Sequence, residues 1–159
     1  MPLQIKSPLE KEFVLEKTDE KFEVTGEPTI VKIRQATQGG FMSRNQLFDE
    51  LRREFAGPIM TVVQRISFDA VRRREVWLTL VSSNILKENG KALFNEETAK
   101  DEIEFGRSWA TLDPFVADEI HEKVLEVNYL WSESGEAPAN TDTKKSEKKS
   151  KNTTEASTS

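Results

Sequence analysis

The sequence predicts a mainly α-helical fold with a small N-terminal antiparallel β element, an α+β domain followed by a disordered tail. Three observations lead to this prediction. Apolar residues recur at helical spacing in several segments, strand-like alternation is confined to residues 12–35, and aromatic residues stop at Trp131. We therefore expect one compact helical domain with a β ribbon at residues 1–132 and a polar tail at residues 133–159.

The β element is predicted from two short stretches, EFVLE (12–16) and TIVKIRQ (29–35), in which apolar and polar residues alternate. The segment TGEPT between them supplies a glycine and a proline for a turn. A two-stranded ribbon alone is marginal in water, so it must lie against the helices.

The first helix is predicted to follow the break at QGGFM, with Ser43 and Gln46 as a capping box. Gly57 and Pro58 should end it, because glycine adopts the left-handed cap and proline cannot continue a helix. Its apolar positions at helical spacing are Leu47, Phe48, Leu51 and Phe55.

A second helix is predicted from Ser67 onward. The stretch VWLTLV within it is equally compatible with a strand, but the charged lead-in DAVRRRE favours a helix. Asn89 and Gly90 then form a turn, either the exit of this helix or the tip of a short hairpin. The apolar stripe comprises Phe68, Val71, Trp77, Leu78, Leu80, Val81 and Ile85.

Two more helices are predicted toward the end of the domain. The acidic stretch NEETAKDEIEFGRSWATL should be one helix with Ile103 and either Trp109 or Leu112 turned inward, weakened by Gly106. Asp113 followed by Pro114 is a typical helix start. The last helix is amphipathic: its apolar stripe is Val116, Ile120, Val124, Val127 and Trp131, and its opposite face is Asp118, Glu119, Glu122 and Glu126.

His121, the single histidine, lies in DEIHEKVLEV, which begins like the zinc helix H-E-x-x-H but has Leu125 at the second histidine position. One imidazole and a neighbouring carboxylate make a poor metal site. We therefore expect a histidine at the border of the apolar stripe, no metal and no cofactor. The carboxylates of KDEIEFG match no calcium loop, and the glycines match no phosphate loop, so no catalytic constellation is predicted.

Charge and composition restrict the partners. The chain has a net charge of -5 and no cysteine. The arginine runs LRREF and VRRRE are flanked by acids at spacings that favour pairs within one helix, so nucleic-acid binding is not expected. The sequence has no apolar run long enough to span a membrane and no apolar leader, and we expect a cytoplasmic protein.

Nine phenylalanines and three tryptophans are many for a domain of this size, and an aromatic residue left at the surface is a common interface anchor. The alternative, that all of them are core residues, is equally compatible with the composition. Trp131→Ala is expected to weaken partner capture more than folding. The predicted partner-binding residues are Phe115, Ile120, Val124, Tyr129 and Trp131.

Two segments, TIVKIRQATQGGFMSRNQLFDELRREF and SWATLDPFVADEIHEKVLEVNYLW, resemble the tail assembly chaperones of long-tailed bacteriophages in the order of their parts. An extended segment leads into helices, and the last helix opens on a proline and ends near Asn128 and Trp131. That family often has a proline after the asparagine, whereas this chain has Tyr129. The resemblance covers residues 12–132.

The resemblance implies a non-catalytic phage tail assembly chaperone. Such a protein binds the tape-measure protein, keeps its apolar helices from aggregating, and helps recruit tail-tube subunits in the host cytoplasm. One alternative is a structural head-tail connector or tail-completion protein, and a second is a nucleic-acid-binding regulatory protein. The oligomeric state is left open.

Overall fold

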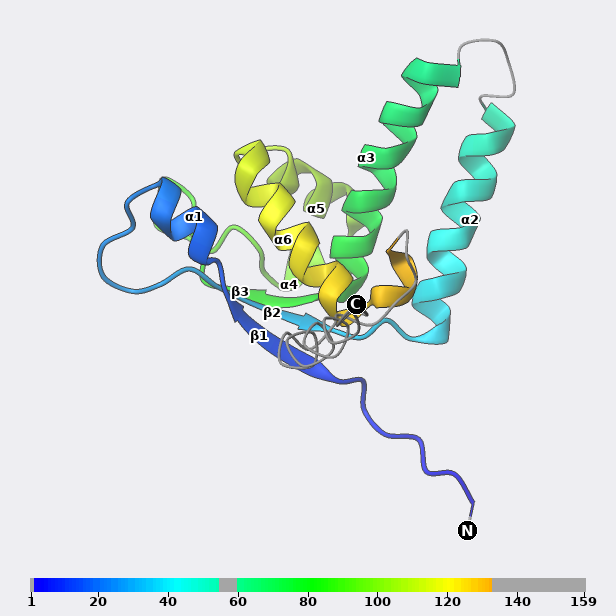
Figure 1. Cartoon of the computed structure of the whole chain (residues 1–159), viewed down its shortest axis with the longest axis horizontal. Coiled ribbons are helices and arrows are strands. Elements are labelled where there is room, and N and C mark those ends of the chain that lie inside the picture. The colour runs from blue at the N-terminus through cyan, green and yellow to red at the C-terminus, as the bar shows by residue number, and fades with distance from the viewer. Residues whose placement is uncertain (1, 55–59, 133–159) are drawn as a thin grey trace, which may run out of the picture.

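The computed structural model describes residues 2–54 and 60–132, with only the backbone considered at residues 54 and 60–68. These residues form a small antiparallel sheet packed against helices, which confirms the predicted α+β class (Figure 1). The helices are α1 (Glu16–Lys21), α2 (Gln38–Glu54), α3 (Met60–Thr79), α4 (Glu96–Lys100), α5 (Glu102–Trp109) and α6 (Pro114–Val127), followed by a 3-10 turn, η1 (Tyr129–Trp131). The predicted disordered tail, residues 133–159, and the predicted helix end at Gly57–Pro58 lie outside the described residues.

The sheet has three strands in the order β1 (Glu10–Val14), β2 (Ile30–Arg34) and β3 (Leu80–Ser83). The predicted ribbon is its β1–β2 half, paired in register from Glu10 opposite Arg34 to Val14 opposite Ile30. β3 joins the other side of β2, with an irregularity at Lys32 and Ile33. The ribbon is thus stabilised by a third strand as well as by helices.

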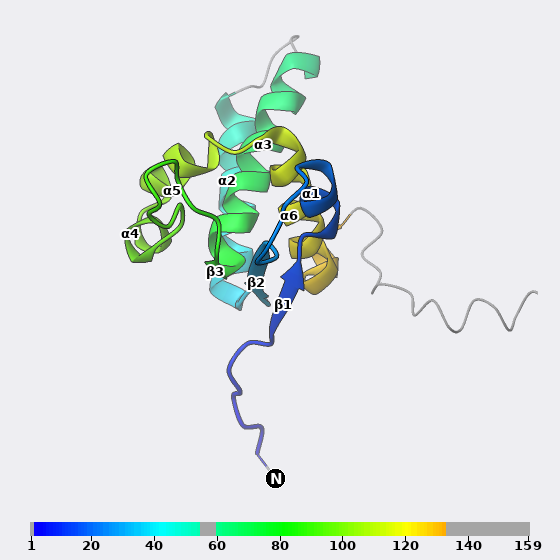
Figure 2. The same cartoon turned by 90° about the vertical axis from the view of Figure 1, so that its left-hand side faces the viewer.

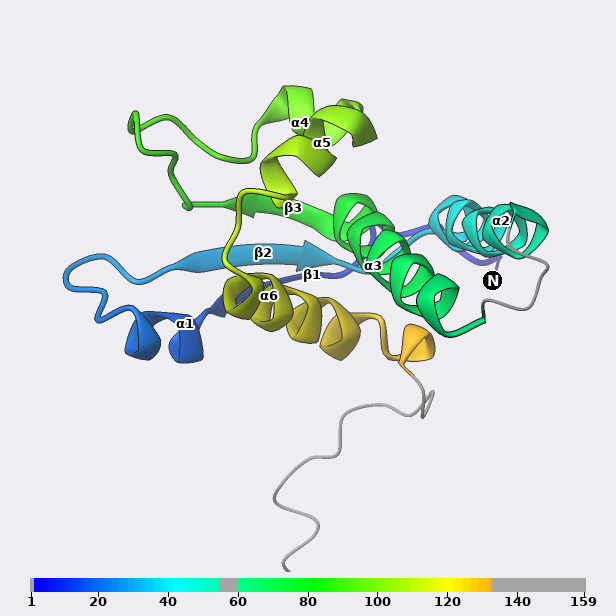
Figure 3. The ribbon, with the colours of Figure 1, turned by 90° about the horizontal axis from the view of Figure 1, so that it is seen from above.

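The two faces of the sheet differ in polarity. One face contributes Phe13, Val31 and Ile33 to the core, and α6 packs across β2 on this side (Figure 3). The alternate positions on the other face are charged apart from Val14 and Ile30 at one end, and Lys32 forms an ion pair with Glu10 at 3.6 Å. The core therefore lies between one sheet face and the helices, with Leu15, Val76, Ile120 and Val124 fully enclosed.

Helix α1 occupies the connection for which the sequence predicts a plain turn. Its N-cap position, Leu15, has no capping side chain. Instead the Glu119 carboxylate of α6 accepts hydrogen bonds from the backbone NH groups of Lys17 (3.0 Å) and Thr18 (2.8 Å). A long-range cap of this kind leaves no local pattern in the sequence.

Helix α2 begins at Gln38, so the predicted break at QGGFM and the predicted capping box at Ser43 and Gln46 are both wrong. The Thr37 hydroxyl caps this end, accepting a hydrogen bond from the Gly40 NH at 3.3 Å. Gly40 is buried, and a Cβ there would lie 3.3 Å from the Ala36 Cβ. Lack of room beside the Ala36 side chain, rather than a turn, thus accounts for this glycine.

Helix α3 starts earlier than predicted and passes directly into β3, so VWLTLV is part helix and part strand. Leu80 and Val81 lie in the strand and Ile85 beyond it, not on the helix stripe. The Thr79 hydroxyl donates to the Glu75 carbonyl at 2.7 Å, a bond that competes with continuation of the helix. Lys87 and Lys91 then pair across the Asn89–Gly90 turn, which is the tip of a short hairpin.

The predicted single acidic helix is two helices, α4 and α5, joined at Asp101. Asp101 ends α4 in an extended conformation, and its carboxylate caps α5 by accepting from the Ile103 NH at 2.9 Å. Ile103 is 69% exposed, contrary to prediction, whereas Trp109 and Leu112 pack against the core. The aromatic side chain that α5 buries is Phe105, stacked between Phe94 and Trp109.

Candidate partner-binding site

The five predicted partner-binding residues lie on or just after α6, but in two different environments. Ile120 and Val124 are 0% exposed and Trp131 is 7% exposed, so all three are core residues. Phe115 and Tyr129 are half-buried and retain accessible surface. The start of α6 agrees with the sequence, because the Asp113 carboxylate accepts from the Phe115 NH at 2.8 Å and Pro114 follows.

The apolar stripe of α6 is enclosed by the protein itself. The helix packs against β2 and α3, and its end leads into η1, where the Trp131 ring lies 5.3 Å from the Phe41 ring of α2. The Arg44 guanidinium lies 5.5 Å from the same Trp131 ring. Since Trp131 is packed in this way, Trp131→Ala should cost about 3–5 kcal/mol of stability. This burial argues against the expectation that the substitution weakens partner capture more than folding.

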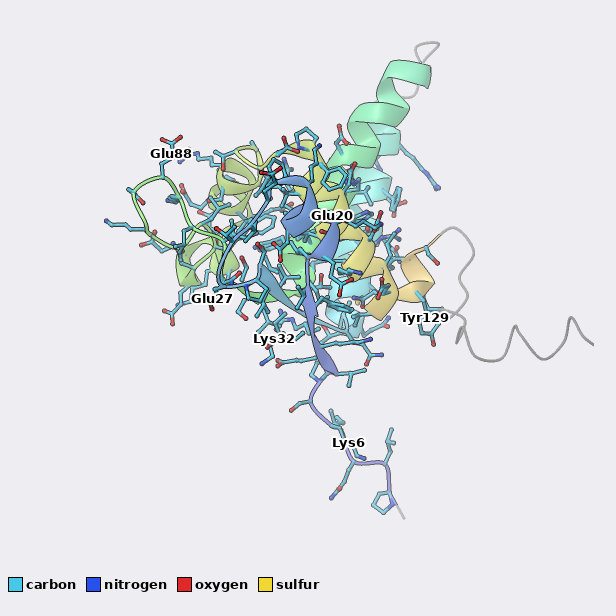
Figure 4. All side chains as sticks on the ribbon, turned by 60° about the vertical axis from the view of Figure 1, so that its left-hand side comes forward. Lys6, Glu20, Glu27, Lys32, Glu88 and Tyr129 are labelled. Atoms are coloured by element: carbon cyan, nitrogen blue, oxygen red, sulfur yellow. The ribbon has the colours of Figure 1, made fainter. Side chains whose placement is uncertain are left out.

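A small groove remains open at the C-terminal end of α6. We call it the C-terminal groove, and it has a volume of about 190 Å³. Leu130 on its rim is 62% exposed, and Tyr129 stands at the outer edge of the molecule (Figure 4). Its lining residues are Gln35, Ala36, Phe41, Val127, Asn128, Tyr129 and Leu130.

Asn128 fixes the shape of this groove. Its side-chain carbonyl accepts from the Ala36 NH at 2.7 Å, and its amide donates to the carbonyls of Arg34 (3.1 Å) and Val124 (3.2 Å). The end of α6 is therefore tied to the segment that connects β2 to α2. The groove suits one apolar side chain of a partner better than a small-molecule ligand, which needs at least about 300 Å³.

The buried ionisable groups form a separate cluster between three helices. Glu75 on α3 is 2% exposed; its Oε1 accepts from Arg44 Nε of α2 at 2.6 Å, and its Oε2 lies 2.6 Å from His121 Nε2 of α6. His121 is 8% exposed, so it is buried rather than at the border of the stripe. Its partner, Glu75, is 46 residues away in the sequence, so no local sequence pattern predicts the contact.

The contacts of the Glu75 cluster are those of a structural group that joins three helices. Both carboxylate oxygens of Glu75 are occupied, and the Arg44 guanidinium is also stacked 4.8 Å from the Phe48 ring. A carboxylate that orients a histidine serves catalysis when the imidazole also reaches a nucleophile. Among the residues that the structure describes, no group of three histidine, cysteine or acidic side chains fits a metal ion.

Glu119 was predicted to lie on the solvent face of α6, but it is 3% exposed because it caps α1. Around it, Lys17 donates a hydrogen bond from Nζ to Glu122 at 2.8 Å, and Lys21 lies 4.2 Å from the Phe115 ring. The hydrogen bond to Glu122 raises the pKa of Lys17 above its ordinary value of 10.5. The exposed part of Phe115 is therefore next to α1, and it does not reach the C-terminal groove.

The arginines pair mainly between helices, whereas the sequence favoured pairs within one helix. Arg72 pairs with Asp118 of α6, and Arg74 Nε donates to Glu102 of α5 at 2.7 Å. Gly106 of α5 makes room for the α3 side chain opposite it, since a Cβ there would lie 3.3 Å from Arg73 Cδ. The arginines of α3 thus join α3 to α5 and α6.

Two further hollows lie near β3. The larger, of about 750 Å³, lies between the hairpin after β3 and helix α5, with Leu86, Glu88 and Arg107 among its lining residues (Figure 4 labels Glu88). The smaller, of about 230 Å³, runs beside the outer edge of β3 and under α4; we call it the β3 groove. It is lined by Trp77, Leu80, Val81, Ser82, Ser83, Phe94, Asn95, Glu96, Thr98, Ala99 and Phe105.

Comparison with known proteins identifies no relative. No protein-family model matches the chain, and neither the curated proteins nor the solved structures contain a match. Within residues 2–54 and 60–132, no helix combines the length and the apolar character that crossing a bilayer requires.

Proposed function

We propose that this protein is a non-catalytic assembly chaperone of the phage tail assembly chaperone class. In this proposal it holds an apolar helical segment of a tape-measure protein and helps recruit tail-tube subunits to it in the host cytoplasm. The observation that carries the proposal is the C-terminal groove, a recess of mixed polarity that includes the aromatic side chains of Phe41 and Tyr129 and has exposed Leu130 on its rim. An amphipathic helix binds by placing its apolar anchor side chains against a partner surface, and the C-terminal groove can take one of these anchors.

The buried ionisable groups support the non-catalytic part of the proposal. Glu75 has both oxygens engaged by Arg44 and His121, and Glu119 has both oxygens engaged by backbone NH groups of α1. A general acid or base needs a free path to the proton that it transfers. These side chains are used to join helices to one another.

The first test is capture of tape-measure fragments by the purified protein. Leu130→Asp places a charge on the rim of the C-terminal groove and should weaken capture about ten-fold or more, as expected for loss of an interface anchor. Its melting temperature should stay unchanged, because Leu130 is 62% exposed. Ile103→Asp on α5 is the matched control: Ile103 is 69% exposed and lies outside the groove, so capture should stay at the wild-type level. Equal capture by both variants and the wild type would contradict the proposal.

The alternative role of a structural connector or tail-completion protein predicts a different location. Mass spectrometry of purified phage particles should find the tape-measure and tube proteins without this chain, since a chaperone leaves before the particle is complete. Detection of the chain at a fixed copy number per particle would favour the connector.

A further inference from the structure

The N-terminal arm, residues 2–9, exposes apolar side chains that have no partner in the described part of the chain. It leaves the body from the start of β1 and runs away from it (Figures 1 and 2). Leu3 is 93% exposed and Ile5 is 98% exposed, the two most exposed large apolar side chains that the structure describes. They alternate with the polar residues Gln4 and Lys6, so an extended arm has one apolar and one polar side.

An acceptor for such an arm lies at the opposite edge of the sheet. β3 is an edge strand, with β2 on one side and the β3 groove on the other. The lining of that groove includes Trp77 and the largely buried Phe94 and Phe105, together with polar residues such as Ser82 and Asn95. An unpaired strand edge beside an apolar recess is the arrangement to which an extended peptide adds as a further strand, with backbone hydrogen bonds along the edge and side chains in the recess.

We propose that the N-terminal arm of one copy of this chain adds to the β3 edge of a second copy, with Ile5 in the β3 groove and Leu3 on the same side of the added strand. The polarity of the arm matches the sheet that it would extend, which has an apolar face at Phe13, Val31 and Ile33 and a charged face at Glu12 and Lys32. Pro2 and Pro8 bracket the arm, and they limit the added strand to residues 3–7 because proline has no NH to donate. The self-association does not depend on the proposed client.

The arm cannot reach its own β3 edge. A strand beyond β3 lies three strand spacings, about 14 Å, from β1, whereas Pro8 and Leu9 together span at most about 7 Å. A hairpin back onto β1 is also excluded. The Leu9 carbonyl accepts from the Gln35 NH at 2.8 Å, which holds Leu9 in the sheet, and the favoured two-residue hairpin turns need a first residue with positive φ that proline cannot adopt. The acceptor therefore belongs to another molecule.

Charge also favours this pairing. Lys6 is the arm's one charged side chain and extends fully into solvent (Figure 4). The rim of the β3 groove carries Glu96, and Glu97 is its neighbour on α4. The positive arm therefore docks beside a negative rim, and reciprocal exchange of two arms gives a closed pair.

The experiment measures mass by sedimentation or light scattering over a range of concentrations. The wild-type chain should approach twice the 18.2 kDa of one copy, and removal of residues 2–8 should give a single copy throughout. Leu3→Asp with Ile5→Asp should weaken association about ten-fold or more without a change in fold, because both side chains are exposed. Met42→Asp with Ile103→Asp is the control: it adds the same two charges at exposed apolar residues outside the β3 groove, and it should associate like the wild type. A wild-type chain that stays single at all concentrations, or an assembly that survives removal of the arm, would overturn the proposal.

The absence of cysteine allows a direct test of the contact. A tagged Ile5→Cys chain mixed with an untagged Ala99→Cys chain should give a disulfide-linked pair of unequal tags under a mild oxidant, since Ala99 lines the β3 groove. An untagged Leu130→Cys chain replaces the second partner in the control and should give no such pair. Cross-linking of Ile5→Cys to Leu130→Cys, or to neither site, would place the arm elsewhere and overturn the proposal.

Discussion

The Glu75 carboxylate is almost completely removed from water and is shared by side chains of two other helices. Arg44 neutralises it from α2 and His121 contacts it from α6, each at 2.6 Å. A buried charge is costly unless it is paired, and removal of one partner leaves the other uncompensated. The cluster therefore makes the packing of α2, α3 and α6 mutually dependent.

Glu75→Gln tests this dependence. The variant leaves the Arg44 guanidinium without a counter-charge and should lower the free energy of unfolding by about 3 kcal/mol. Glu104→Gln is the matched control, because Glu104 pairs with Arg107 on the exposed surface of α5 and should lose less than about 0.5 kcal/mol. Urea unfolding followed by circular dichroism measures both. Equal small losses would show that the buried cluster is energetically neutral.

Asn128 is a second residue whose contribution to the free energy of unfolding should depend on its burial. Asn128→Asp keeps the shape but replaces the amide that donates to the Arg34 and Val124 carbonyls with a carboxylate that only accepts. We expect a loss of about 1–3 kcal/mol in unfolding free energy. Asn84 makes a comparable pair of bonds, to the Ile30 NH and the Pro28 carbonyl, but it is exposed, so Asn84→Asp should cost less. A larger loss at Asn84 would contradict the role given to burial.

Helix α1 shows how an element can depend on a distant residue. Its six residues are too few to be stable alone, and its N-terminal NH groups are capped by Glu119, about a hundred residues along the chain. Lys17 and Glu122 add an exposed ion pair nearby. The raised pKa of Lys17 means that any stabilisation from this pair is complete below pH 10.5 and is lost only as the pH rises through the raised value.

Glu119→Ala should therefore release α1 while the sheet stays folded. Loss of a helix cap costs about 0.5–2 kcal/mol, and two NH groups lose their acceptor here. Hydrogen exchange at neutral pH should speed up at the amides of Lys17 and Thr18 more than at those of β2. Glu122→Ala, which removes only the exposed partner of Lys17, should leave these rates near the wild-type values. Unchanged protection in Glu119→Ala would contradict the capping role.

The elements that the sequence predicts correctly are those whose signals are local. Asp113 and Pro114 mark the start of α6, and its stripe of Val116, Ile120 and Val124 is buried as the spacing requires. The errors arise where a distant residue decides the outcome. Glu119 caps α1. Pairing with β2 makes Leu80–Ser83 a strand, although the local pattern favours a helix. The burial that confirms the apolar stripe of α6 also means that Ile120, Val124 and Trp131 are not on a partner-binding surface. Periodicity shows which face of a helix is apolar, but it does not show whether the protein itself or a partner covers that face.

Charge is unevenly distributed over the molecule as a whole. Arginines concentrate on α2 and α3, whereas acidic residues predominate on α1, α4, α5 and α6. Contacts across the helices offset this separation: Arg44 pairs with Glu75, Arg72 with Asp118, and Arg74 with Glu102. Several arginines are therefore neutralised by acidic side chains of neighbouring helices, and the chain as a whole carries a net charge of -5.

This charge distribution predicts the result for the nucleic-acid alternative. A protein that binds a phosphate backbone releases counterions, and its affinity then falls steeply as salt rises. We expect fluorescence anisotropy with labelled single- and double-stranded DNA to detect no binding at physiological salt, because the acidic body repels the phosphates. The exposed Arg52 and Arg53 on α2 are the residues best placed to produce weak binding at low salt, and Arg52→Glu with Arg53→Glu should abolish it. Binding that persists at physiological salt and is lost in this double variant would favour the regulatory protein over the chaperone, because an assembly chaperone has no use for an affinity carried by two surface arginines.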